Sequence, residues 1–284
     1  MRNLAVLEED PLAVYDAIAS SKDEPRRSRL GALRSRVGCA YLRYYAHRPA
    51  LERQQPLGRR ISPEEVRDLL HCYDGMSDKG SRAYDRYYAR IRALTYYCAY
   101  CGIHRARMLD HYLPKAGKRG YPELAVLPAN LVPSCGECNP PRDFRDKNGQ
   151  RSLINPYFDT IRQERLLVAE VGVVAGVPEV EFRVDLSGCI DVEFGRLYER
   201  HIRLLDLLKR YRERAMLADD GLARFVDSVR IWAEGMARVE VLARLWEEVK
   251  EYERKLGVNH FWAALTRGAA TSNALVDFCV GSTS

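Results

Sequence analysis

The chain has 284 residues, of which 46% are hydrophobic and 30% are charged, and its formal net charge is +6. This composition is typical of a globular protein with a substantial core, and it argues against disorder and low complexity. The acidic run Glu8–Asp10 precedes any long apolar stretch, and the most apolar stretch, LLVAEVGVVAGV, is short and contains Glu170. We therefore expect a cytoplasmic protein with neither a signal peptide nor a membrane span.

Residues 1–97 are predicted to form a helical, basic N-terminal region. The segment ISPEEVRDLLHCYD begins with Ser62 and Glu65 at the spacing of a capping box, and SRAYDRYYARIRALTYY, residues 81–97, predicts a further helix. An earlier set of apolar residues recurs at near-helical spacing and predicts the buried side of another helix: Leu30, Leu33, Val37, Ala40, Tyr41 and Tyr44.

A run of arginines lies within this region. Between residues 25 and 62 the chain has one acid, Glu52, and tyrosines are interleaved with the basic residues. A polyanion would suit this segment because guanidinium groups match phosphate oxygens, while a solvated helix face is an equally good interpretation. The arginines are Arg26, Arg27, Arg29, Arg34, Arg36, Arg43, Arg48, Arg53, Arg59 and Arg60.

Two Cys-x-x-Cys pairs follow, CAYC at Cys98 and Cys101 and CGEC at Cys135 and Cys138. Two such pairs in a cytoplasmic chain predict a structural Zn²⁺ site with four thiolate ligands, which leaves no open position for catalysis. Thioredoxin-like redox chemistry is the competing use, but neither pair is predicted to lie on a strand-to-helix turn. Four scattered cysteines are expected to be small buried side chains: Cys39, Cys72, Cys189 and Cys279.

Between the two pairs the chain is predicted to form two short strands. The first spans residues 107–113 and contains Asp110 and His111, and the second spans residues 131–134, directly after Asn130. A helix is expected to begin at Asn139, with a proline in its first turn. Closure by zinc would then bring Asp110, His111 and Asn139 to one face.

The remainder, residues 160–284, is predicted to form a hairpin and then helices. RLLVAEVGVVAG and EVEFRVDL are two candidate strands joined by a Gly-Val-Pro turn. LYERHIRLLDLLKRY and ARVEVLARLWEEVKEYERKL are strongly amphipathic, and residues 219–221 (Asp-Asp-Gly) predict a break between helices.

The order CxYCG, LDHYLPK and then ANLVPSCGECN resembles the zinc-stapled ββα-metal fold of HNH endonucleases whose third signature residue is Asn. The resemblance covers residues 98–159. The flanking helices are loosely similar to stand-alone bacterial HNH proteins such as the nuclease component of the Septu anti-phage system, which implies an ATPase partner. The expected fold is α+β and predominantly helical, with a nuclease module at 98–159 between helical regions at 1–97 and 160–284.

The resemblance assigns roles to individual residues. His111 suits a general base, and Asp110 and Asn139 offer oxygen ligands for Mg²⁺ or Mn²⁺. Asn130 would brace the loop that aims His111. Each role has an alternative. In these interpretations His111 is a buried, hydrogen-bonded core histidine, Asp110 only orients His111, Asn130 is a turn residue and Asn139 is a helix cap.

Two basic residues are candidate contacts to a substrate phosphate. Lys115 is a better candidate than His104, although solvent exposure is the default for both. Arg142 stands where relatives usually have Lys, which keeps the charge but changes the geometry of a phosphate contact.

The sequence thus predicts a metal-dependent nuclease acting on DNA, with a role in defence against foreign DNA implied by the resemblance. A zinc-stapled module that binds nucleic acid without cutting it is the alternative from another class. A nuclease acting on RNA is a third possibility, because such an active site contacts phosphate and sugar more than base.

Overall fold

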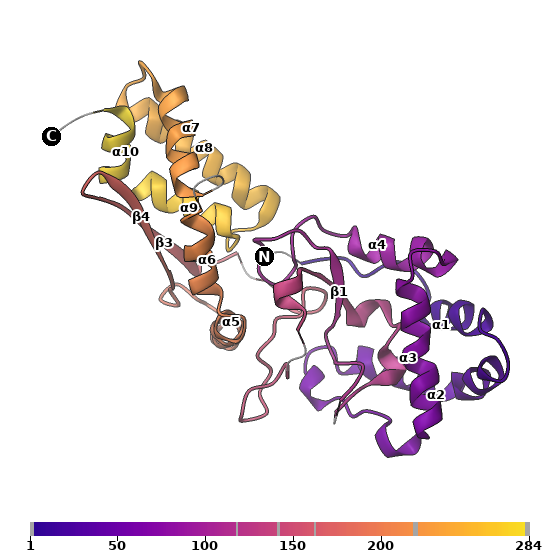
Figure 1. The fold of residues 1–284 in the computed structure, drawn as a ribbon. Helices are drawn as coiled ribbons and strands as arrows, with labels where there is room; N and C mark the ends of the chain where they lie inside the picture. The colour runs from indigo at the N-terminus through magenta and orange to yellow at the C-terminus, as the bar shows by residue number, and fades with distance from the viewer. Residues whose placement is uncertain (1–2, 118, 141–142, 162, 218–220, 282–284) are drawn as a thin grey trace. The chain divides into compact units, whose positions relative to one another are not determined.

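A computed structural model describes residues 3–117, 119–140, 143–161, 163–217 and 221–281. About 53% of the chain is helical, and two small antiparallel sheets complete a mostly helical α+β structure, as predicted (Figure 1). The chain divides into two compact units, residues 3–100 with 104–160 and residues 161–284 with 101–103. No helix in the described ranges is long and apolar enough to cross a membrane.

Three helices form the N-terminal part of the first unit: α1 (Pro11–Ser20), α2 (Arg26–Ala46) and α3 (Pro63–Ser77). They pack against one another, and all six apolar residues predicted for the inner side of α2 are buried. The predicted capping box is present at the start of α3. Short 3₁₀ turns lie between α2 and α3, at Leu51–Arg53 and Gly58–Arg60.

The helix predicted for residues 81–97 is shorter than expected. It consists of a π-helical segment, η3 (Tyr84–Tyr88), followed by α4 (Ala89–Arg92). Beyond α4 the backbone pairs with the chain after the first cysteine pair, since the Ala106 N–H donates to the Tyr96 carbonyl at 2.9 Å. This pairing competes with helix continuation.

Strands β1 (Met108–His111) and β2 (Leu131–Ser134) form the first antiparallel sheet, in the region where the sequence predicts two strands. Asp110 lies opposite Val132 in the register, and His111 lies opposite Leu131. The connection contains two 3₁₀ turns, η4 (Pro122–Leu124) and η5 (Pro128–Asn130). A third, η6 (Gly136–Cys138), follows β2.

The helix expected after Asn139 is absent from the described residues 143–160. Turns occupy this segment instead: the Asp146 carboxylate accepts hydrogen bonds from the backbone N–H groups of Asn148 and Gln150. A side chain that captures backbone donors in this way competes with helical hydrogen bonding. The prediction of a helix here was wrong for these residues.

The second unit contains the predicted hairpin, β3 (Leu167–Val174) and β4 (Val177–Val184). Its turn is Ala175-Gly176, both with positive φ (50° and 78°), whereas Val177 and Pro178 of the predicted turn already belong to β4. Two central residues with positive φ match the right-handed twist of the strands.

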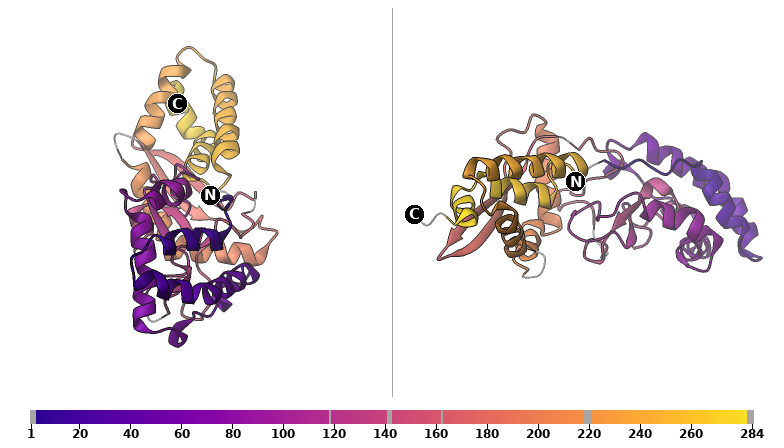
Figure 2. Two further views of the ribbon diagram at one scale, coloured as in Figure 1. Left: turned by 90° about the vertical axis from the view of Figure 1, so that its right-hand side faces the viewer. Right: turned by 90° about the horizontal axis from the view of Figure 1, so that it is seen from above.

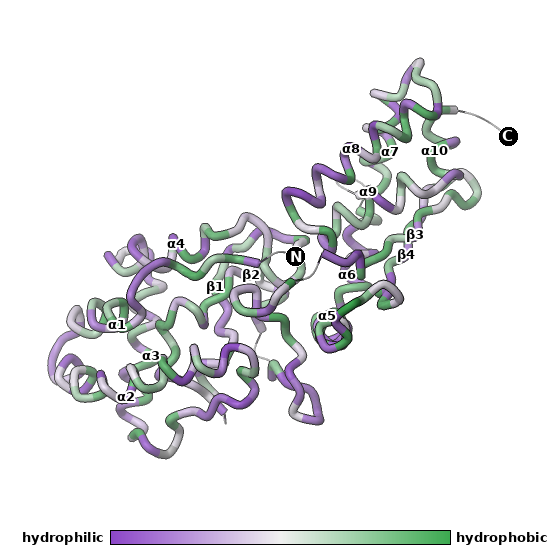
Figure 3. The backbone as a smooth tube through the Cα atoms, turned by 180° about the vertical axis from the view of Figure 1, so that it is seen from behind, coloured by the Kyte–Doolittle hydropathy of each residue, from purple (hydrophilic) through white to green (hydrophobic). Residues whose placement is uncertain are grey.

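The described part of this unit also contains six helices: α5 (Val192–Leu204), α6 (Leu207–Ala215), α7 (Leu222–Ala233), α8 (Arg238–Leu256), α9 (Phe261–Thr271) and α10 (Asn273–Val280). Helices α9 and α10 pack on β3, and α6 and α7 pack on β4. Figure 2 shows the C-terminal helices, in orange and yellow, from two further sides. Hydropathy alternates along α8, as expected for an amphipathic helix (Figure 3). Asp206, with φ 50°, separates α5 from α6 within the predicted LYERHIRLLDLLKRY helix. The predicted break at 219–221 lies largely outside the described residues, and α7 begins after Gly221.

Candidate active site

The four cysteines of the two Cys-x-x-Cys pairs form one cluster. Their sulfur atoms all lie within 4.8 Å of one another, and all four side chains are buried. A tetrahedral zinc site with Zn–S bonds of about 2.3 Å places its sulfurs about 3.8 Å apart, so the cluster needs only a small contraction to hold the ion. None of the cysteines is joined in a disulfide. The chemistry and spacing of these ligands therefore fit a structural zinc ion.

Backbone hydrogen bonds hold the two cysteine pairs in place. The Cys98 N–H donates to the His104 carbonyl at 2.8 Å, which closes the first pair into a knuckle. The Ala99 N–H donates to Pro133 of β2 at 3.0 Å, and Gly102 has φ +68°, a conformation that glycine adopts without strain. The Cys98 knuckle is thereby tied to the strand that leads into the second pair.

The other four cysteines divide into two groups. Cys72 and Cys279 are buried, as expected, whereas Cys39 is exposed and Cys189 is half-buried. Cys39 lies on the solvent side of α2, because it is two positions after the buried Val37 and one before the buried Ala40, and such neighbours do not share a helix face. The expectation that all four are buried was wrong for these two.

A cavity of about 320 Å³ lies beside β1 in the first unit. Asp110, His111, Lys115 and Asn139 all line it, together with apolar side chains that include Phe144 and Leu153. Four of the polar residues singled out in the sequence therefore share one cavity. Arg142 lies outside the described residues.

Asn130 does not line the cavity but anchors the chain that forms its wall. Its side chain is fully buried, its amide oxygen accepts from Leu113 N–H at 2.8 Å, and its amide nitrogen donates to the carbonyls of Leu113 at 3.0 Å and Leu124 at 3.3 Å. The Asn130 carbonyl also accepts from Tyr112 N–H at 2.9 Å. One residue thus ties the end of β1 to the loop that crosses over it.

His111 is held by that same loop. Its Nε2 lies 2.9 Å from the Ala125 carbonyl, and because a carbonyl can only accept, this contact places the ring proton on Nε2 and leaves the Nδ1 lone pair available. Burial lowers the pKa of His111 to about 3, and the nearby Lys115 ammonium acts in the same direction, against the Ala125 hydrogen bond. The imidazole is therefore neutral at pH 7.

Asp110 of β1 and Asn139 at the end of η6 both line the cavity. Asp110 is 9% exposed, and Asn139 is half-buried. The Asn139 amide nitrogen lies 3.4 Å from the Met108 sulfur, a weak acceptor, so its amide oxygen is the atom suited to bind a ligand.

Lys115 and His104 differ in their surroundings. The Lys115 ammonium lies 4.0 Å from the centre of the Tyr73 ring and 3.8 Å from the Asp74 carboxylate, and burial lowers its pKa. His104 lies outside the cavity lining, with Nε2 3.1 Å from the Glu137 carboxylate. Lys115 is the one of the two positioned to contact a ligand in the cavity.

Tyr73 of α3 lines the cavity and was not singled out in the sequence. Its ring meets the His111 ring edge-on, with centroids 4.4 Å apart, and its hydroxyl donates to the Leu109 carbonyl at 3.3 Å. The sequence predicts the helix but carries no signal that Tyr73 reaches a strand 36 positions further along. Long-range packing alone brings it to the site.

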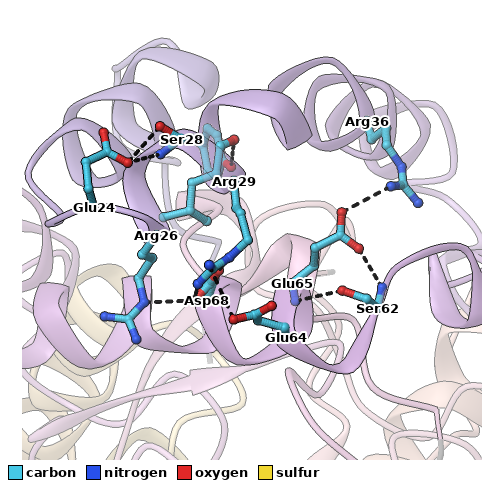
Figure 4. A network of polar contacts seen from close by, with 11 residues as sticks. Glu24, Arg26, Ser28, Arg29, Arg36, Ser62, Glu64, Glu65 and Asp68 are labelled. Carbon is cyan, nitrogen blue, oxygen red and sulfur yellow. Dashed lines mark hydrogen bonds and ion pairs between the residues drawn. The ribbon is translucent and has the colours of Figure 1, made fainter.

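Half of the arginines in the run form ion pairs within the described part of the chain. Arg26 Nε lies 2.8 Å and Arg29 Nε 2.6 Å from the buried carboxylate of Asp68 in α3 (Figure 4). Three further arginines of α2 each have an acidic partner: Arg27 with Glu24, Arg34 with Asp16 and Arg36 with Glu65. Five of the ten arginines thus pair with acids that lie outside residues 25–62. This arrangement favours a structural role for Arg26 and Arg29 over contact with a polyanion.

Over part of its length the chain is similar to a phage protein. The chain is 33% identical over 124 residues to protein ea31 of Escherichia phage lambda, a match that covers 40% of this chain and 39% of that protein. No family model matches, and no solved structure matches.

Proposed function

We propose that the protein is a metal-dependent HNH endonuclease that hydrolyses phosphodiester bonds in DNA. The observation that carries the proposal is the cavity that Asp110, His111, Lys115 and Asn139 share. It lies beside the β1–β2 sheet, which Asn130 braces and which the four clustered cysteines flank. The motif order in the sequence and the shared cavity in the structure are separate observations, and both support the same proposal.

His111 is proposed as the general base. A neutral ring with its proton fixed on Nε2 by Ala125 can accept a proton from water at Nδ1. The carbonyl holds the ring orientation, so little reorganisation precedes the transfer. A pKa of about 3 makes this ring a weaker base than an ordinary imidazole, so we assign it the lower end, roughly 10²-fold, of what a general base contributes to a rate.

Asp110 and Asn139 are proposed to hold a divalent cation. A carboxylate and an amide oxygen are hard ligands that suit Mg²⁺ or Mn²⁺, ions that retain several waters and bind phosphate oxygens. When bound, such an ion supplies Lewis-acid stabilisation of negative charge on a phosphodiester. Both residues lie in the cavity that His111 lines.

Lys115 is proposed to contact a non-bridging phosphate oxygen. Its ammonium is held over the Tyr73 ring by a cation–π contact, and its stem is partly buried, so a phosphate entering the cavity meets a positioned cation. The zinc ion would act at a distance, by fixing the knuckles that flank the hairpin.

The proposal is tested by plasmid nicking with added Mg²⁺ or Mn²⁺. Wild type should nick, and His111→Ala should nick at least 100-fold more slowly with unchanged zinc content and DNA affinity. His71→Ala, which removes an exposed histidine of α3, is the matched control and should nick like wild type. Equal nicking by wild type and His111→Ala would contradict the proposal.

The alternatives correspond to other results of the same assay. A wild-type chain that binds DNA but never cuts it would be a zinc-stapled binding module. Labelled DNA and RNA digested in parallel identify the substrate, since cleavage of RNA alone would replace DNA in the proposal. A role in anti-phage defence with an ATPase partner rests on the resemblance alone and remains a prediction.

A further inference from the structure

A second cavity, of about 610 Å³, lies on the first unit next to the knuckle. Side chains of η3, α4 and the chain on both sides of the first cysteine pair line it. We call it the basic groove. Four of its lining residues are cations and three are tyrosines: Lys79, Arg92, Arg105 and Arg107, with Tyr84, Tyr88 and Tyr96.

The charge of the groove is unbalanced. No Asp or Glu lines it, and within the described residues none of its four cations has an acidic partner at ion-pair distance. Arg105 and Arg107 are exposed. The arginines of α2 provide the contrast, because Arg26 and Arg29 share a buried carboxylate. Uncompensated cations in a concave surface attract a polyanion and gain from counterion release.

The tyrosines of the groove offer aromatic faces. Tyr84 and Tyr88 are stacked with ring centroids 5.1 Å apart, and Tyr96 is 58% exposed, an unusual state for so large a ring. The Arg105 guanidinium lies 4.6 Å from the centre of the Tyr96 ring. Alternating guanidinium and aromatic surfaces are what proteins use to stack unpaired bases and neutralise their phosphates.

The basic groove and the proposed active site lie at opposite ends of β1. Arg107 directly precedes β1 and lines the groove, whereas His111 ends β1 and lines the first cavity. Four residues of strand span about 13 Å, a length that a few nucleotides of an unpaired strand can cover. Tyr73 and Tyr88 also link the two sites, with ring centroids 6.4 Å apart. A strand bound in the groove would have its neighbouring nucleotides at His111.

We infer that the basic groove binds an unpaired nucleic-acid strand, a few nucleotides from the phosphate that is cut. Phosphates contact Lys79, Arg92, Arg105 and Arg107, and a base stacks on Tyr96. This inference rests on the proposed nuclease function and adds a preference for single-stranded or frayed substrate. DNA and RNA share the recognised chemistry.

Binding without cleavage tests the inference. The full chain is titrated against fluorescein-labelled 12-nucleotide DNA and RNA strands and a 12-base-pair DNA duplex, without added Mg²⁺ or Mn²⁺, and anisotropy is recorded at several salt concentrations. Arg105→Ala/Arg107→Ala should reduce the dependence of log K on log salt by about 1.4 for the single strand. Arg27→Ala/Arg34→Ala removes the same charge from ion-paired positions and should leave the dependence near that of wild type.

Tyr96 tests the stacking contact. Tyr96→Ala should weaken single-strand binding between about fivefold and about a hundredfold, with a much smaller loss for duplex, while Tyr96→Phe keeps the ring and should bind like wild type. Circular dichroism checks that each variant is folded. Binding of DNA or RNA single strands identifies the polymer.

Equal losses in the two arginine pairs, or an unchanged Tyr96→Ala, would overturn the inference. The proposed function is tested separately by nicking. If cleavage depends on His111 but the groove variants bind like wild type, the inference about the groove is wrong and the proposed nuclease function stands. Groove-dependent binding by a chain that never cuts would overturn the assignment of the bound strand as substrate.

Discussion

Asn130 and Leu113 are joined by two hydrogen bonds, one in each direction between a side-chain amide and a backbone peptide group. Oδ1 accepts from Leu113 N–H at 2.8 Å and Nδ2 donates to the Leu113 carbonyl at 3.0 Å. The pair sits at the point where the chain leaves β1 and begins the loop that carries Ala125, the partner of His111. The orientation of the imidazole therefore depends on a residue that never reaches the cavity.

Replacing Asn130 with Asp tests this dependence with almost no change in shape. The substitution removes the Nδ2 donor and places a carboxylate oxygen near the carbonyls of Leu113 and Leu124, in a fully buried position. We expect a loss of about 3 kcal/mol in the free energy of unfolding, measured with urea, and nicking reduced at least tenfold. Asn148→Asp, at an exposed turn, is the control. Wild-type stability in Asn130→Asp would show that the loop is held by other contacts.

The cysteine cluster predicts one zinc ion per chain. Cys135→Ser removes one ligand. Because structural zinc contributes on the order of 10 kcal/mol to folding, we expect the chain to lose both the ion and the folded β1–β2 sheet. Zinc content by elemental analysis and protection of residues 98–139 in hydrogen exchange measure the two effects. Cys39→Ser, at an exposed position of α2, should retain zinc. A Cys135→Ser chain that is folded and binds a full equivalent of zinc would contradict this assignment.

Tyr73 provides a test of the cavity wall. Tyr73→Leu removes the aromatic face under Lys115 and the edge contact to His111, so we expect nicking to slow about tenfold with the fold intact. Tyr73→Phe keeps both ring contacts and loses the hydroxyl bonds to Leu109 and Tyr88, neither of which touches the cavity cation or His111, so its rate should stay within about twofold of wild type. Equal rates for the two variants, measured under single-turnover conditions, would mean that the ring does not position the site.

The parts of the site that the sequence predicts well are those encoded by short-range spacing. Each Cys-x-x-Cys pair and the strand β2, at the predicted residues 131–134, are defined by neighbours a few positions apart. The two pairs converge across 33 residues because four thiolates are the usual ligand set of one structural zinc ion. The helix expected after Asn139 failed for the described residues because Asp146 captures the backbone N–H groups that a helix would use. A proline in a plausible first turn is a weaker signal than this local competition.

The sequence did not predict the side-chain contacts between distant segments. Tyr73 reaches Leu109 across 36 positions, and no local pattern distinguishes it from other tyrosines of the N-terminal helices. The arginine run looked unpaired because its acids lie outside it, as the buried Asp68 of α3 shows. Charge counted within a segment does not reveal which elements will pack against it.

The Asp68 network makes a prediction about acid stability. Burial would raise the pKa of this carboxyl, but hydrogen bonds from Arg29 and Arg26 outweigh that effect and hold the pKa below its ordinary value. A carboxyl whose pKa is lower in the folded state stabilises the fold above its unfolded pKa of about 4, and this stabilisation disappears as the pH falls through the folded value.

Asp68→Asn should therefore destabilise the chain at pH 7, by about 1–3 kcal/mol, and the difference from wild type should shrink as the pH falls below about 4. Asp16→Asn breaks the exposed pair with Arg34 and should cost less than about 1 kcal/mol at any pH. Urea unfolding at pH 7 and at stepwise lower pH measures both. Arg26 and Arg29 hold this carboxylate, so replacing them with alanine should also lower the free energy of unfolding. The same replacement should leave DNA affinity nearly unchanged. A pH-independent difference between Asp68→Asn and wild type would show that the network stabilises α2 and α3 through packing and not through the charge on Asp68.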